Sequence, residues 1–249
     1  MRTANPAMKA FLDPQLLDRP AAASMTFGGT IAKTGILLGL CFTTATMAWQ
    51  YMQGAPTGQG MIAVLGSAIA GLVVGLIVSF APRTAPILAP VYALLQGAFV
   101  GFLSWVIPQH FNVPPGIVVQ AMFLTFGIAA AVLLAFSLGL VRLSGTAMKV
   151  VVVATVGVGL YYALGMLLNM LGVGIVQLGW EAGWLGIGFS LFVVVLASLN
   201  LVLDFQFIEA GVTNKAPRYM EWYGAFGLLV TLVWLYIEVL RLLAKFNKR

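Results

Sequence analysis

Long apolar runs separated by short polar breaks make up most of this chain. Seven runs are long enough to cross a bilayer, because a helix needs about 20 apolar residues to span the hydrocarbon core. They cover Thr30–Tyr51, Gly60–Phe80, Pro86–Ile107, Gly116–Leu140, Met148–Leu171, Gly183–Ile208 and Met220–Leu243. The breaks carry turn residues, as in QGAPTGQ, APRTA and PQHFNVPP. The pattern predicts an all-α membrane protein, a bundle of seven transmembrane helices.

The composition supports this prediction and excludes several classes of protein. Among 249 residues, 61% are hydrophobic and 8% are charged, whereas soluble domains average about 45–50% and about 25%. A water-soluble enzyme is therefore excluded. No basic patch interleaved with aromatic residues is present, which argues against nucleic-acid binding. Residues 1–29 lack the uninterrupted apolar core of a signal peptide, so we expect a polar cytoplasmic tail ahead of a transmembrane domain at residues 30–249.

The distribution of Lys and Arg predicts the orientation in the membrane, since positive charge marks the cytoplasmic side. With seven spans, the side of the N-terminus holds Arg2, Lys9, Arg19, Lys33, Arg83, Arg142, Lys149, Lys215 and Arg218. The opposite loops hold no Lys or Arg. A cytoplasmic N-terminus follows. The C-terminal residues Lys245, Lys248 and Arg249 conflict with it, because the last helix is long enough to cross and would place them outside.

Acidic residues within the apolar runs are the first candidates for function. An ionised carboxylate at the bilayer centre costs on the order of 3 kcal/mol, so such groups face the protein interior or water and often mark ion or proton routes. Asp204 lies near the end of the sixth run, with Asn200 four residues earlier on the same helical face and Gln206 two residues later. We expect Asp204 to bind and release a proton near physiological pH and to change partners. A solvated, inert Asp204 at the interface is the alternative.

Two further acids lie in the last run. Glu221 begins that run, where the helix dipole favours an anion, and a simple headgroup-level charge is the alternative to an ion ligand. Glu238 precedes Arg241 by three residues, a spacing that predicts an ion pair within one helix. A hairpin of the last two runs centred near Asn214 would place Gly224 at the level of Asp204.

Candidates for other chemistry are few. The chain has no HExxH or GxSxG motif, and its one histidine, His110, lies in a loop. A metal site recruits several ligands. The one cysteine, Cys41, lies in an apolar run and fits a packing role. We therefore expect neither an enzyme nor a bound cofactor.

Pairs of glycines four residues apart predict places where transmembrane helices approach closely. The pairs are Gly35 and Gly39, Gly71 and Gly75, and Gly97 and Gly101. Such packing allows a monomer or a weak homo-oligomer.

The segment DFQFI, followed by YGAFGLLVTLVWLYIEVLRLL, resembles the Bax inhibitor family of seven-helix membrane proteins, especially its bacterial branch. That family carries an Asp-x-Gln-x-Ile motif in its sixth helix, which Asp204, Gln206 and Ile208 match. Further matches in the last run are Glu221, Tyr223, Gly224, Ala225 and Arg241. The resemblance implies a Bax-inhibitor-like bundle with the last helix at its centre, in a bacterial inner membrane.

The resemblance also implies a calcium-permeable leak pathway gated by pH. In the family, two aspartates of the sixth and seventh helices share a proton, and an arginine latches onto the first aspartate. Here Thr231 stands where the second aspartate is expected, which removes that coupling. Asp204 then acts with Arg83 alone, or Glu221 substitutes for the missing carboxylate. Calcium is in this interpretation the transported ion.

Two other functions remain as alternatives. Some bacterial relatives look like non-conducting regulators that bind another membrane protein, such as a protease. A proton-coupled transporter for a small solute is the third hypothesis, although the chain shows no convincing internal repeat of the kind many transporters have. Ion flux through the purified protein alone separates a channel from a regulator.

Overall fold

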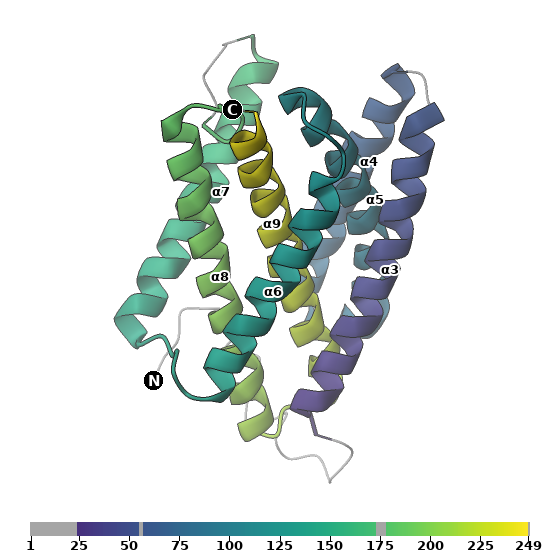
Figure 1. The fold of residues 1–249 in the computed structure, drawn as a ribbon. Coiled ribbons are helices and arrows are strands. Elements are labelled where there is room, and N and C mark those ends of the chain that lie inside the picture. Colours follow the sequence, from purple (N-terminus) through teal and green to yellow (C-terminus); the bar gives the residue numbers. More distant parts are fainter. Residues whose placement is uncertain (1–23, 55–56, 173–177, 249) are drawn as a thin grey trace. The chain divides into compact units, whose positions relative to one another are not determined.

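The computed structural model describes residues 24–54, 57–172 and 178–248, with the backbone alone for residues 57–65 and 170. Within these ranges the chain forms seven long α-helices and a short 3-10 helix. In chain order they are α3 (Phe27–Gly54), α4 (Thr57–Phe80), η1 (Pro82–Thr84), α5 (Ala85–Phe111), α6 (Ile117–Ser137), α7 (Gly145–Met170), α8 (Trp184–Thr213) and α9 (Met220–Asn247). Figure 1 follows them from α3 in purple to α9 in yellow.

Helices are the expected result for these runs, because a helix satisfies its own backbone hydrogen bonds where no water is available. Among the described residues, helix accounts for 85% and no strand forms. Six helical stretches are long and apolar enough to cross a membrane, and Gly66–Phe80 of α4 is a shorter apolar helix. The chain is therefore an all-α, multi-pass membrane protein. In the most apolar window of α9, 72% of the residues are buried, against 17% in α3, α6 and α7.

The first helix begins earlier than predicted. Thr26 caps α3, because its Oγ1 accepts the backbone N–H of Gly29 at 2.9 Å, the usual arrangement at a helix start. Just before the cap, the N–H of Met25 donates to the carbonyl of Ala216 at 2.7 Å. The predicted tail therefore ends inside a folded contact, and its residues 1–23 lie outside the described residues.

The chain divides into two compact units. The first contains residues up to 103 and residues 206–230, which include α3 and α4. In this unit α5 approaches α3 as its glycines predict, since a Cβ on Gly97 or Gly101 would lie 2.2 Å from the carbonyl oxygen of Cys41 or Ala45. Gly35 and Gly39 differ, because a Cβ on either would meet no atom within 4 Å.

The second unit contains residues 104–205 and residues from 231 on, which include α6 and α7. Its core forms where α7 packs against α8, around the buried side chains of Val151, Val158, Val193 and Leu196. Asn200 of α8 crosses to α7, where its amide donates to Thr155 Oγ1 at 2.8 Å.

The turn between α8 and α9 corrects one prediction. Gly224 lies beside Ile208, whose Cγ1 would be 3.2 Å from a Cβ on Gly224, and Asp204 hydrogen-bonds Thr231. The prediction that Gly224 lies at the level of Asp204 is therefore wrong. The connection continues past Asn214 to the start of α9 at Met220, so the centre of the hairpin lies later in the chain. Each shift of that centre by one residue moves the opposite position by two.

Candidate functional site

Asp204 is a carboxylate in the interior of the long apolar helix α8. Its side chain is half-buried and hydrogen-bonds Thr231 of α9. Its other oxygen, Oδ2, is buried and has no hydrogen-bond partner among the described residues. The structure thus joins Asp204 to Thr231, the residue at which the resemblance leads us to expect a second aspartate. A hydroxyl can donate to a carboxylate, whereas a second carboxylate would have to share a proton with it.

The other residues predicted around Asp204 have different surroundings. Asn200 donates to Thr155 and to the carbonyl of Leu196, at 2.8 and 2.9 Å. Gln206 is half-buried in α8, and Arg83 lies exposed in η1. Of the predicted members of this site, Thr231 hydrogen-bonds Asp204.

Glu221 is 2% exposed at the start of α9. Its Oε1 accepts both the backbone N–H and the hydroxyl of Thr26, each at 2.9 Å. Its Oε2 forms a short ion pair with Lys33. Lys33 and Thr26 therefore enclose the carboxylate of Glu221 at the start of α9, and its level relative to the lipid headgroups stays a prediction. Both oxygens of Glu221 therefore accept hydrogen bonds within the protein.

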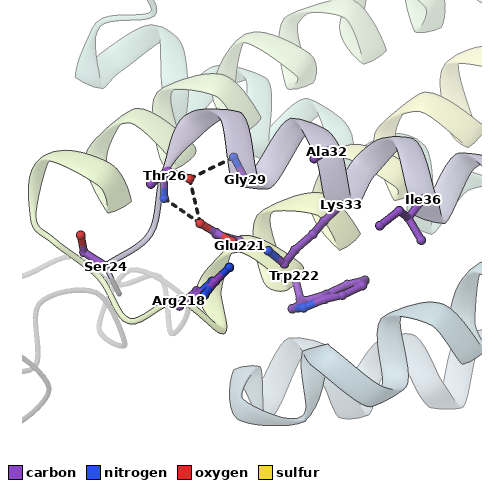
Figure 2. Close-up of a pocket in the computed structure, with 9 residues that line it drawn as sticks. All are labelled: Ser24, Thr26, Gly29, Ala32, Lys33, Ile36, Arg218, Glu221 and Trp222. Atoms are coloured by element: carbon purple, nitrogen blue, oxygen red, sulfur yellow. Dashed lines mark hydrogen bonds and ion pairs between the residues drawn. The ribbon is translucent and has the colours of Figure 1, made fainter. Parts of the chain in front are cut away.

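Gly29 makes the position of Glu221 possible. In a capping box, an acid three residues after the cap accepts the N–H of the capping residue. Gly29 occupies that position after Thr26 but has no side chain, and a Cβ there would lie 2.3 Å from Glu221 Oε1. Figure 2 shows Glu221 reaching from α9 to Thr26 and filling this space. The cap of α3 is thus completed by a residue of another helix.

Glu238 and Arg241 form the predicted ion pair, with Arg241 Nη1 at 3.0 Å from Glu238 Oε1. The pair is buried, since Glu238 is 1% exposed. Tyr162 of α7 donates its hydroxyl to the same oxygen at 3.0 Å. The Arg241 guanidinium lies over the rings of Tyr162 and Trp180, at 5.2 and 5.0 Å from their centres. Glu238 Oε2 and Arg241 Nε have no partner among the described residues.

Lys245 is the residue that the sequence analysis missed. It is fully buried, and its ammonium donates to the carbonyls of Leu178 and Gly186 and to Ser190 Oγ, at 2.8, 2.8 and 2.7 Å. A signal was present, because Glu238, Arg241 and Lys245 recur at helical spacing on one face of an apolar helix. Three charges on such a face indicate a buried network.

The three candidate carboxylates therefore have separate environments. Asp204 contacts a hydroxyl, Glu221 a lysine and a helix cap, and Glu238 an arginine and a tyrosine. In the described part of the chain, no group of three or more His, Cys, Asp or Glu side chains is placed to hold a metal. A calcium site from Asp204 and Glu221 stays a prediction. Asp204 differs from the other two, because its hydrogen bond is with a hydroxyl rather than a cation and its Oδ2 has no partner among the described residues. That oxygen is free to accept a mobile proton or cation.

Comparison with known proteins identifies the family. A family model described as Bax inhibitor 1 like matches residues 5–248. We found no match among curated proteins or among solved structures. The match covers nearly the whole chain, including the Asp204 motif and all of α9, and it confirms the family that the sequence resembles. The chain therefore belongs to the Bax inhibitor 1 like family of membrane proteins.

Proposed function

We propose that this protein is a pH-sensitive calcium leak channel, with Asp204 as the group that responds to protons and ions. In this proposal seven helices cross a bacterial inner membrane, α9 lies at the centre and the N-terminus is cytoplasmic. The observation that carries the proposal is the buried Oδ2 of Asp204, which has no hydrogen-bond partner among the described residues. Membership of the Bax inhibitor 1 like family supports it.

Burial of Oδ2 without a hydrogen-bond partner raises the free energy of the folded protein. A buried polar atom without a partner costs about 1–3 kcal/mol, and more when it is charged. A proton or a passing cation relieves this cost, while the hydrogen bond with Thr231 holds the side chain in place. Occupancy by either one therefore excludes the other, which links ion passage to pH.

The ligand count suits passage of calcium better than storage. Calcium prefers about six to eight oxygen ligands, and Asp204 with the Thr231 hydroxyl offers far fewer. Binding is then weak and transient, as a leak requires. Because Thr231 stands in place of a second carboxylate, no proton is shared between two acids. We expect a simple titration of one group.

The test is calcium flux into liposomes that contain the purified protein, at about pH 6 and about pH 8. Wild type is compared with Asp204→Asn, which keeps the shape of the side chain and cannot ionise. Glu209→Gln is the matched control, because it removes one acid from the same helix five residues away. We expect the ratio of flux at the two pH values to change in Asp204→Asn and to persist in the control.

Two results would overturn the proposal. Equal pH dependence in wild type and Asp204→Asn would show that Asp204 does not respond to protons. Absence of flux at both pH values would favour a non-conducting regulator that acts on another membrane protein.

A further inference from the structure

A pocket of about 640 Å³ lies in the first unit, where α3 and α9 begin. Its lining includes the side chains of Lys33, Arg218, Glu221 and Trp222. Figure 2 shows Lys33 and Arg218 both reaching toward Glu221, Lys33 from α3 and Arg218 from the segment before α9. The pocket is therefore lined by two cations and one carboxylate, and it carries a net positive charge.

The hydrogen-bonding groups of the pocket are unevenly used. Both oxygens of Glu221 already accept, from Thr26 and from Lys33. The guanidinium of Arg218 has no hydrogen bond or ion pair with any residue that the structure describes, and it offers five N–H donors. The indole N–H of Trp222 is likewise without a partner in the described ranges. Spare donors face a pocket whose acceptors are occupied, so the complementary ligand is an anion rich in acceptor oxygens.

Arg218 is suited to one kind of anion. Its planar guanidinium matches the geometry of a phosphate in a bidentate manner. The Lys33 ammonium lies 5.5 Å from the centre of the Trp222 ring and supplies a second positive charge beside it. Arg218 is exposed, so it can reach a ligand that enters from outside the protein.

The position of the pocket indicates the source of such a phosphate. Ile36 also lines it and is 53% exposed, one helical turn from Lys33 toward the apolar part of α3. Tryptophan is enriched at the membrane interface, and basic pockets between transmembrane helices on the cytoplasmic side bind anionic lipid headgroups. Charged and aromatic side chains at one end and apolar ones at the other match a headgroup and the start of its acyl chain.

We propose that this pocket binds the phosphate group of an anionic phospholipid, with Arg218 and Lys33 as the phosphate ligands. Trp222 lies beside the headgroup, and Ile36 contacts the acyl chain. The site does not involve Asp204 and does not depend on channel activity. A soluble phosphate has the same chemistry, and the experiment separates the two sources.

The experiment measures binding to the purified full chain in detergent micelles by native mass spectrometry. The probes are dioleoylphosphatidylglycerol, dioleoylglycerol, which lacks the phosphate, and inorganic phosphate. We expect the phospholipid to bind more tightly than dioleoylglycerol. Arg218→Gln should weaken its binding about fivefold. The Arg218 side chain is exposed and unpaired within the described residues, so this variant is expected to fold.

Lys215→Asn is the matched control. Lys215 lies three residues before Arg218, is exposed and does not line the pocket; its φ of 53° suits Asn. We expect less than about a twofold effect. If Arg218→Gln and Lys215→Asn weakened phospholipid binding equally, the binding would reflect diffuse electrostatic attraction and the proposed site would be wrong. Equally tight binding of the phospholipid and dioleoylglycerol would also contradict the site, because the phosphate would then contribute nothing. Arg218-dependent binding of inorganic phosphate as tight as that of the phospholipid would support the site and assign it to soluble phosphate.

Discussion

Substitution of Gly29 by Ala tests the cap that Glu221 supplies to α3. A Cβ at this position would lie 2.3 Å from Glu221 Oε1 and 2.5 Å from its carboxyl carbon. Both neighbours belong to a side chain held by Thr26 and Lys33, so the carboxylate has to leave its partners. Ala favours a helix over Gly by up to about 1 kcal/mol. A hydrogen bond to a charged group contributes about 1.5–3 kcal/mol, and at least two such bonds are lost.

The net expectation for Gly29→Ala is a loss of about 2–5 kcal/mol in the free energy of unfolding. In a Glu221→Ala background the space is empty, and the same substitution becomes neutral or stabilises by up to about 1 kcal/mol. The assay is a denaturant titration of the four proteins of this double-mutant cycle in detergent micelles. Gly28→Ala is the control, because a Cβ there meets no atom within 4 Å.

The cycle refutes the reasoning if Gly29→Ala has the same effect in both backgrounds. Such additivity would mean that the residues do not interact. A loss in Gly28→Ala equal to that in Gly29→Ala would point to a general intolerance of side chains at the start of α3.

Three further substitutions probe other contacts, each by the midpoint of thermal unfolding. Lys245→Met leaves two carbonyls and a hydroxyl without their buried donor and should destabilise the folded protein by about 2–4 kcal/mol. Lys248→Met changes an exposed side chain and should leave the stability unchanged. Equal effects of the two substitutions would contradict the buried contacts of Lys245. Ser104→Ala and Tyr236→Phe each remove one buried hydrogen bond of 2.7 Å, so each should cost about 1 kcal/mol and the double variant little more; full additivity would disprove the coupling. Gly101→Ala would place a Cβ 2.2 Å from a carbonyl oxygen and should cost at least about 2 kcal/mol; an unchanged midpoint would mean that α3 and α5 can separate freely.

The helices were predictable because the bilayer imposes one solution on a long apolar run. Which helices pack against one another was not predictable. Transmembrane helices are apolar on nearly every face, so hydropathy does not reveal which face is buried. Gly35 and Gly39 have the same spacing as Gly97 and Gly101, yet the second pair alone approaches another backbone.

The candidate site was predictable only in part. The Glu238–Arg241 pair lies within one helix, and its spacing predicts it. Glu221 and Thr26 are 195 residues apart, and nothing local in the sequence joins them. The contact between Asp204 and Thr231 depends on how many residues the turn before α9 contains, which hydropathy fixes only to within several residues. An error of two residues at the centre of that turn moves the opposite position by about one helical turn.

The buried charges of α9 bear on the orientation proposed for the chain. Lys and Arg determine orientation through charges that face the aqueous phase near the membrane. Arg241 is neutralised by Glu238, and the Lys245 ammonium is enclosed by two carbonyls and a serine. Neither acts as a free positive charge in the folded chain. The apparent conflict at the C-terminus therefore narrows to Lys248, which is exposed, and Arg249, which lies outside the described residues. By the same criterion Lys33, which is paired with Glu221, is left out of the nine cations on the side of the N-terminus, and eight remain. Two cations at the very end are a weak opposing signal against these eight, so a seventh crossing with the C-terminus outside remains the favoured proposal. A C-terminal tag accessible from the cytoplasm alone would disprove it.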